Sequence, residues 1–207
     1  YLESLPIWIV NEIVNWVGII EARNIAKAFN RRPKIDLRIN SLKTNLEKFL
    51  KELYKYDIDA ALIDKLDNAI TINSNPRSIK NLPGYKEGMW VVQDRSSQWV
   101  APLLAPEKGE KILDACAAPG SKTTHIAQLT NDDAEILAVD NSDKRLKILK
   151  SNLDRLNIKS VKTYKADATR LIEIKPNLIS YFDKILIDAP CSGIGTFARN
   201  PDSRWAL

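Results

Sequence analysis

The spacing of apolar positions predicts that the chain opens with helices. Residues 2–30 carry apolar side chains at helical spacing, interrupted by polar ones, which is typical of an amphipathic helix. Gly18 breaks this pattern, so we expect a second helix over Glu21–Phe29. Pro33 follows within a basic stretch and ends any helix before it.

From residue 35 the hydrophobic period changes to two. Apolar and polar residues alternate over Ile35–Ile39, which predicts a strand with one buried face. We expect a helix over Leu46–Tyr54 and two further short strands over Ala69–Ile72 and Met89–Val92. The pattern indicates a small α+β unit.

Beyond residue 110, strands and helices alternate. We expect strands over 111–115, 135–139, 161–164 and 184–187, with helices over 121–129 and 144–156. This order predicts a parallel sheet covered by helices. The proline- and glycine-containing stretch 101–109 is the best boundary, which gives predicted domains of residues 1–105 and 106–207.

Composition narrows the class of protein. The 207 residues are 44% hydrophobic and carry a net charge of +5, with no apolar run long enough to span a membrane. The mild positive charge suits a polyanionic partner without requiring one. Cys116 and Cys191 lie far apart and His125 is the one histidine, so we expect no metal site, no disulfide framework and a reducing cytoplasm. The chain begins at Tyr1 and its one methionine is Met89, which indicates a piece of a longer protein.

The stretch Asp114–Thr123 lies between a predicted strand and a predicted helix. Its small residues allow the backbone to approach a ligand, and the helix N-terminus offers free N–H groups. It matches neither the nucleotide P-loop nor the glycine pattern of nicotinamide-binding proteins. A tight turn without a ligand is the alternative interpretation.

Carboxylates follow the next two predicted strands. Asp140 ends the second strand, where it is placed to accept hydrogen bonds from ribose hydroxyls. Asp167 follows the third strand, where a helix cap is the alternative. Together with the small-residue loop, they predict a nucleoside pocket at the carboxyl edge of the sheet.

The fourth strand leads into Asp188-Ala189-Pro190-Cys191-Ser192-Gly193. A thiol at the mouth of the crevice would face a substrate base, and its reactivity would require thiolate character. A small buried hydrophobe is the alternative for Cys191.

Two motifs carry a resemblance to a known family. Asp114–Thr124 and Asp188–Gly193 resemble the donor-binding and substrate motifs of the RNA 5-methylcytosine methyltransferases, most closely the Sun/Fmu branch, which acts on small-subunit ribosomal RNA. Further stretches resemble the same family: Leu37–Asn40, Val92–Gln98 and Arg199–Trp205.

The resemblance implies a Rossmann-like S-adenosylmethionine-binding domain behind a small RNA-recognition-like domain. It implies that Asp140 contacts the ribose of the donor, Asp167 its adenine, and that Asp188 lies between donor and target base. It implies that Cys191 assists product release, while the nucleophile belongs to a Thr-Cys motif expected beyond Leu207; we therefore expect this chain alone to be inactive. The loop around the donor's amino-acid end would be Cys116, Ala117, Ala118, Pro119, Gly120, Ser121 and Lys122.

Other residues are assigned with less specific signals. Four basic residues are candidates for RNA phosphate contacts, with a solvated basic link as the alternative: Arg31, Arg32, Lys34 and Arg38. We expect His125 in packing or at the surface, and three tryptophans in the core rather than stacked on bases: Trp8, Trp16 and Trp99.

Alternatives to this function remain open. One is a non-catalytic RNA-binding relative, and another is an enzyme of the same family that acts on tRNA or large-subunit ribosomal RNA. A third is an amine methyltransferase, which the Asp-Ala-Pro-Cys run disfavours. The oligomeric state does not follow from the sequence.

Overall fold

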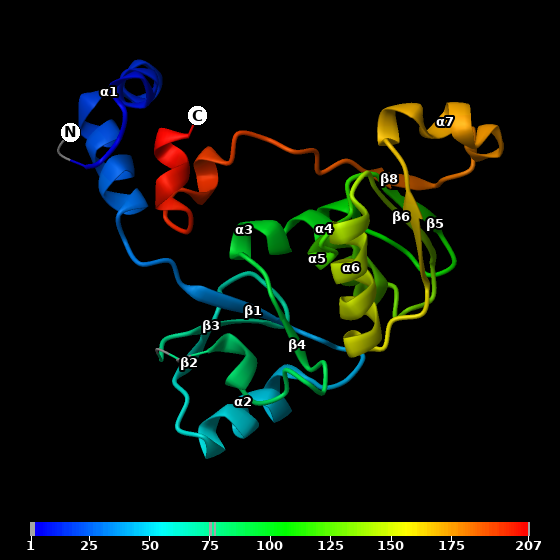
Figure 1. Ribbon diagram of the computed structural model, residues 1–207. Helices are drawn as coiled ribbons and strands as arrows, with labels where there is room; N and C mark the ends of the chain where they lie inside the picture. Colours follow the sequence, from blue (N-terminus) through cyan, green and yellow to red (C-terminus); the bar gives the residue numbers. More distant parts are fainter. Residues whose placement is uncertain (1–2, 75, 77, 207) are drawn as a thin grey trace. The chain divides into compact units, whose positions relative to one another are not determined.

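The computed structural model describes residues 3–74, 76 and 78–206 (Figure 1). The chain forms two compact units. The smaller unit combines residues 1–34 with residues 190–207, and the larger unit comprises residues 35–189. The predicted boundary near residue 106 lies within the larger unit and stays a prediction.

The smaller unit is built on helix α1 (Ile7–Phe29). Gly18 has non-helical backbone angles (φ 79°, ψ 166°), so the helix is kinked where the sequence predicted a break. Two short 3₁₀ helices follow at the other end of the chain, η4 (Ile194–Thr196) and η5 (Pro201–Trp205). Phe197, directly after η4, packs in one core cluster with α1.

Two side chains hold the ends of this unit together. The Phe197 ring, fully buried, lies edge-on to Phe29 at a centroid distance of 5.3 Å. The buried Arg204 guanidinium donates to the Phe29 carbonyl at 2.6 Å and to Asn30 Oδ1 at 2.7 Å. The expectation that Trp8 and Trp16 lie in the core is wrong, because their exposed fractions are 45% and 79%. Both lie on helix α1, on a side away from its buried stripe.

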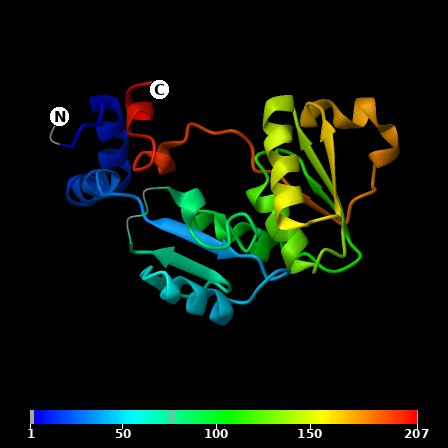
Figure 2. The same cartoon turned by 60° about the horizontal axis from the view of Figure 1, so that its bottom comes forward.

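The larger unit begins with an antiparallel sheet (Figures 1 and 2). Within the described residues its strand order is β2-β3-β1-β4, with helix α2 (Leu46–Lys55) packed on one face. Leu37, Phe49 and Trp90 are fully buried between them. The strands are β1 (Ile35–Ile39), β2 (Ala60–Leu62), β3 (Ala69–Ile72) and β4 (Trp90–Val92).

The second sheet is parallel, as predicted. Its order among the described strands is β7-β6-β5-β8. The strands are β5 (Lys111–Asp114), β6 (Glu135–Asp140), β7 (Val161–Lys165) and β8 (Lys184–Leu186). The helices of this region are α3 (Arg95–Gln98), α4 (Val100–Leu104), α5 (Ser121–Leu129), α6 (Asp143–Leu156) and α7 (Leu171–Ile174). Short 3₁₀ turns are η1 (Ile79–Asn81), η2 (Ala168–Arg170) and η3 (Pro176–Leu178).

Helices cover this sheet on both faces. Apolar residues of α5 and α6 share one core with β5 and β6, and α7 packs on the other face with Leu113 and Val139. The chain runs outward from β5 to β6 and β7, then returns to place β8 on the other side of β5. The order therefore reverses between β5 and β8, and ligands of such Rossmann-like sheets bind outside the carboxyl ends at that reversal.

Candidate active site

The loop that follows β5 is shaped by small residues. Ala117 and Ala118 are buried, and the Ala117 N–H donates to the Val139 carbonyl at 2.9 Å. The Ala118–Pro119 peptide bond is cis. The loop thus lies against the end of β6.

Gly120 makes the turn into α5 possible. Its φ is 101°, a region that other residues rarely adopt, and a Cβ there would lie 2.0 Å from Leu149 Cδ1 on α6. Glycine therefore allows α5 to begin tightly packed on α6.

Asp140 organises this loop from the end of β6. Its carboxylate is 3% exposed, and it accepts hydrogen bonds from the Ala118 N–H at 3.2 Å and the Ser142 N–H at 3.0 Å. Each oxygen has further lone pairs, so the group can still accept hydrogen bonds from a ligand.

Arg145 is a site residue that the sequence did not indicate. Its guanidinium lies 3.4 Å from Asp140 and donates to the Ala118 carbonyl. It stands among several exposed cations at the start of α6, and only the fold distinguishes it from its neighbours.

Lys122 and Asp188 form an ion pair across the reversal point. Lys122 is in the first turn of α5 and Asp188 follows β8, so the pair joins the ends of the two strands on either side of the reversal. The sequence predicted both as site residues, and the structure brings them into contact. Asp188 stays half exposed, with a side-chain exposed fraction of 49%, and its carboxylate faces the carboxyl edge of the sheet.

Asp114, the last residue of β5, holds the start of α5 through a hydrogen bond. It is 1% exposed and accepts a hydrogen bond from Thr123 Oγ1 at 2.7 Å. Burial raises its pKa to about 6, against the lowering effect of the Thr123 hydrogen bond. Burial also raises the pKa of the Cys116 thiol, assisted by the nearby carboxylates, which favours the neutral thiol at this position.

Asp167 caps the short helix η2. Its carboxylate accepts from the Thr169 N–H at 2.9 Å and from Thr169 Oγ1 at 2.7 Å, and these hydrogen bonds lower its pKa. The cap, which the sequence left as the alternative, is present. The side chain is exposed, and its contact with adenine stays a prediction.

Cys191 is an exposed free cysteine in the smaller unit. Its role in product release stays a prediction. Arg31, Arg32 and Lys34 belong to the same unit and are exposed, so their contact with RNA also stays a prediction.

The prediction that Arg38 contacts RNA phosphates is wrong. The side chain is 1% exposed and donates to Gln93 Oε1 at 2.6 Å, the Ser121 carbonyl at 2.7 Å and Thr124 Oγ1 at 2.9 Å. Burial lowers its pKa to about 9. Arg38 therefore ties β1 to the first turn of α5, which carries the candidate loop.

Two other expectations concern this interior. His125 is buried, as packing requires, and burial lowers its pKa to about 2, so it stays neutral. Trp99, expected in the core, is 41% exposed, because it lies at the junction of α3 and α4 beside a surface cavity.

Two features of the described residues bear on other functions. None of their helices is long and apolar enough to cross a membrane. The same residues contain no cluster of three or more histidine, cysteine or carboxylate side chains that could hold a metal ion.

Comparison with known proteins identifies the family. The sequence model described as "16S rRNA methyltransferase RsmB/F" matches residues 101–207, and the one for the ferredoxin-like domain of RsmF/B-like methyltransferases matches residues 5–79. The chain belongs to the RsmB/F methyltransferase family.

Individual relatives agree with this assignment. The probable ribosomal RNA small subunit methyltransferase B of Synechocystis sp. is 40% identical over 98% of the chain and 45% of its own length. The crystal structure of PH0851 is 32% identical, with a TM-score of 0.92 over 100% of this chain and 46% of that one. NSun6 from Pyrococcus horikoshii, solved with SFG, shares the fold at 24% identity, with a TM-score of 0.84 over 100% of this chain and 80% of that one. The chain spans less than half the length of the curated relatives it matches.

Proposed function

We propose that the full-length protein transfers a methyl group from S-adenosylmethionine to C5 of a cytosine in RNA, with small-subunit ribosomal RNA as the preferred substrate. Membership of the RsmB/F family is the observation that carries this proposal. The Lys122–Asp188 ion pair at the strand-order reversal supports it, because it puts a carboxylate where a substrate would meet the donor.

The residues around the loop fit this donor. The buried alanines let the loop lie against the end of β6, Gly120 lets α5 begin there packed on α6, and the Asp140 carboxylate keeps lone pairs for ribose hydroxyls. Cys116–Lys122 would surround the amino-acid end, and Asp167 would meet the adenine. S-adenosylmethionine supplies a methyl group on a positively charged sulfur.

In the full-length protein, side chains would then activate the cytosine for methylation. C5 is a poor nucleophile until a cysteine thiolate adds to C6, which makes C5 resemble an enamine carbon that takes the methyl group. That thiolate would come from the Thr-Cys motif expected beyond Leu207. Asp188 would share a proton with N3, a base would then remove the C5 proton, and the C6–S bond would break with the help of Cys191. The target base must be unpaired or extruded.

The test is transfer of a labelled methyl group by the full-length protein. Unmodified small-subunit ribosomal RNA should be labelled and should yield 5-methylcytosine on digestion, while tRNA and large-subunit RNA should not. Labelling of tRNA instead would move the substrate to another RNA of the same chemistry. Donor binding without transfer to any RNA would make the protein a non-catalytic relative.

We place the proposed methyl transfer in the cytoplasm.

A further inference from the structure

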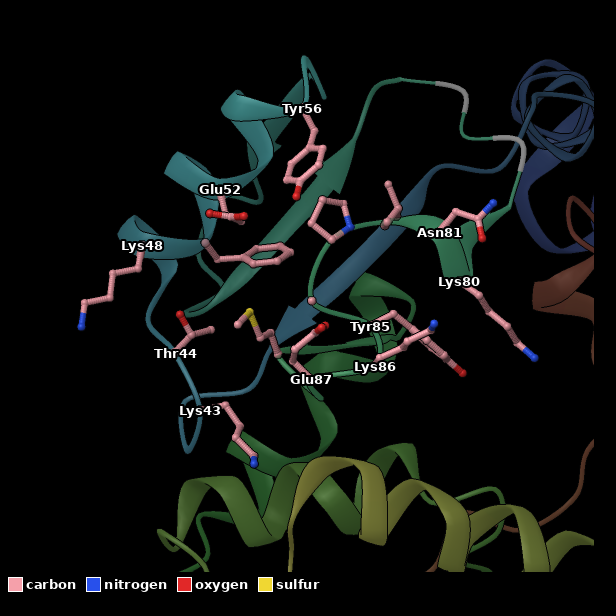
Figure 3. Close-up of a pocket in the computed structure, with 15 residues that line it drawn as sticks. Lys43, Thr44, Lys48, Glu52, Tyr56, Lys80, Asn81, Tyr85, Lys86 and Glu87 are labelled. Atoms are coloured by element: carbon pink, nitrogen blue, oxygen red, sulfur yellow. The ribbon is translucent and has the colours of Figure 1, made fainter.

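A broad hollow opens beside the antiparallel sheet and takes no part in the candidate active site. Its volume is about 720 Å³, and Figure 3 shows α2 and the turn before it along one side and the segment after η1 along the other. Phe49, Leu82 and Met89 supply an apolar floor. We name it the α2 hollow; its lining includes Lys43, Thr44, Lys48, Glu52, Tyr56, Lys80, Asn81, Tyr85, Lys86 and Glu87.

Four lysines surround the α2 hollow without being neutralised. Lys43, Lys48, Lys80 and Lys86 are exposed, and none of them makes an ion pair within residues 3–74, 76 and 78–206. Figure 3 places Lys48 and Lys80 on opposite sides of the opening.

The carboxylates of the α2 hollow leave it positive. The charge of Glu52 is neutralised by Lys55, which lies 2.9 Å away. Among the lining residues, the four lysine charges are then opposed by the single negative charge of Glu87. Such a rim attracts a polyanion.

The wall of the α2 hollow is held in place by contacts with buried or half-buried side chains. Trp90 Nε1 donates to the Pro83 carbonyl at 2.7 Å, and Arg155 of α6 donates to the Tyr85 carbonyl at 2.9 Å while lying 4.4 Å from the Tyr85 ring centroid. A preformed surface loses little conformational entropy when it binds. The same contacts connect this wall to the helix whose first turn carries Arg145 beside Asp140.

The opposite face of the sheet is closed to nucleic acid. Asp36, Arg38 and Asn40 point there and are buried, with Arg38 bonded to α5 and Asn40 to the Leu156 carbonyl. RNA-recognition modules commonly stack bases on an open sheet face, and here α5 and α6 cover that face. An RNA contact of this part of the chain must therefore use another surface.

We propose that the α2 hollow binds single-stranded RNA that flanks the target cytosine, an inference that rests on the proposed function. Its apolar floor and Tyr56 offer contact to unstacked bases, and the lysine rim offers contact to phosphates. A duplex would keep its bases stacked and leave the floor unused.

The experiment uses the full-length protein and a single-stranded fragment of unmodified small-subunit ribosomal RNA. Lys48→Gln with Lys80→Gln should weaken RNA binding by about tenfold and should lower the slope of log affinity against log salt by about 1.4, at roughly 0.7 per phosphate lost. Donor affinity should stay unchanged. The control is Lys51→Gln with Lys108→Gln, which removes two exposed charges outside the hollow and should change neither quantity.

The outcomes separate this inference from the proposed function. If the variant with Lys48→Gln and Lys80→Gln kept the RNA affinity and the salt slope of the wild type, the α2 hollow would not be an RNA site, even with methyl transfer intact. A protein partner would then be the occupant to seek. An equal loss in the control variant would also overturn it. A selective loss in a protein that methylates no RNA would leave the hollow standing and the proposed function refuted.

Discussion

At the scale of single residues, Asp140 is the group on which donor binding should depend most. Replacing Asp140 with alanine in the full-length protein removes a charged acceptor that also holds the Ala118 N–H. We expect the donor affinity to fall by about 1.5–3 kcal/mol, the usual worth of a hydrogen bond to a charged group. Calorimetry on a folded variant measures this, and unchanged affinity would remove Asp140 from the pocket.

Asp114 should give the fold a pH dependence opposite to that of most carboxylates. Its folded pKa of about 6 lies above its ordinary 3.8, so the folded state holds the proton more tightly than the unfolded state. Its contribution is complete below pH 4 and is lost as the pH rises to 6, a difference of about 3 kcal/mol.

Asparagine at this position tests that dependence. Relative to wild type, Asp114→Asn should gain about 3 kcal/mol of unfolding free energy between pH 4 and pH 7, measured by urea denaturation. Asp64→Asn, an exposed change, should show no such trend. A constant difference between wild type and Asp114→Asn across that range would contradict the assignment.

Cys191 should act after methyl transfer. If it assists release, Cys191→Ser in the full-length protein still forms the covalent RNA adduct and accumulates it, which a denaturing gel detects. A variant that binds donor but forms no adduct would identify Cys191 as the nucleophile.

Arg38 shows where reasoning from sequence stopped. The alternation over Ile35–Ile39 correctly put Arg38 on the face opposite Leu37, and an arginine on the second face of a small sheet is normally solvated. One of its acceptors is Gln93 Oε1. The other two are the Ser121 carbonyl and Thr124 Oγ1 of α5, which lie 83 and 86 residues further along the chain. Nothing local in the sequence reports such a partner.

At the scale of elements, the pattern of apolar positions was sufficient for the parallel strands and for the helix that follows the first of them. Helix α5 has the bounds that the sequence predicted, and the four parallel strands agree to within one residue. Strand β2 was missed, because its three residues, Ala60–Leu62, are too short to show a period and carry exposed side chains. Asp140, Asp167 and Asp188 could be predicted as strand-end residues of one site because parallel strands align their carboxyl ends, whereas Arg145 could not.

Strand β8 is an edge of the parallel sheet among the described strands. Among the described strands it pairs with β5 alone, and Ile185 and Ile187 are 52% and 70% exposed. Exposed apolar edges favour association. The 207-residue chain should therefore self-associate with rising concentration in sedimentation velocity, and Ile185→Lys should reduce this. The matched control is Leu103→Lys, at a position on α4 that is 79% exposed. An equal reduction of self-association by this control would show that the chains do not associate through β8.

At the scale of the whole molecule, buried polar groups join the antiparallel sheet of the larger unit to the helices of its other half. Asn40 Nδ2 donates to the Gly88 carbonyl at 2.8 Å and to the Leu156 carbonyl at 3.3 Å. A Cβ on Gly88 would lie 2.1 Å from the Arg155 carbonyl oxygen, so the backbones of the two parts meet directly. These contacts lie within one compact unit, although different family models match its two halves.

This joint limits how the protein can be recombined. A cut near residue 105 would expose Arg38 and Asn40 on one side and remove their hydrogen bonds to the Ser121 and Leu156 carbonyls on the other. In a chimaera whose other half does not supply these partners, the groups would stay buried without hydrogen bonds, at a cost of about 1–3 kcal/mol each, which is a large fraction of a domain's stability. The half that carries the antiparallel sheet therefore cannot be exchanged between relatives by itself. A chimaera would have to inherit β1 together with the first turn of α5 and the end of α6. These positions are distant in sequence, so a substitution at one of them should be tolerated only when its partner changes as well.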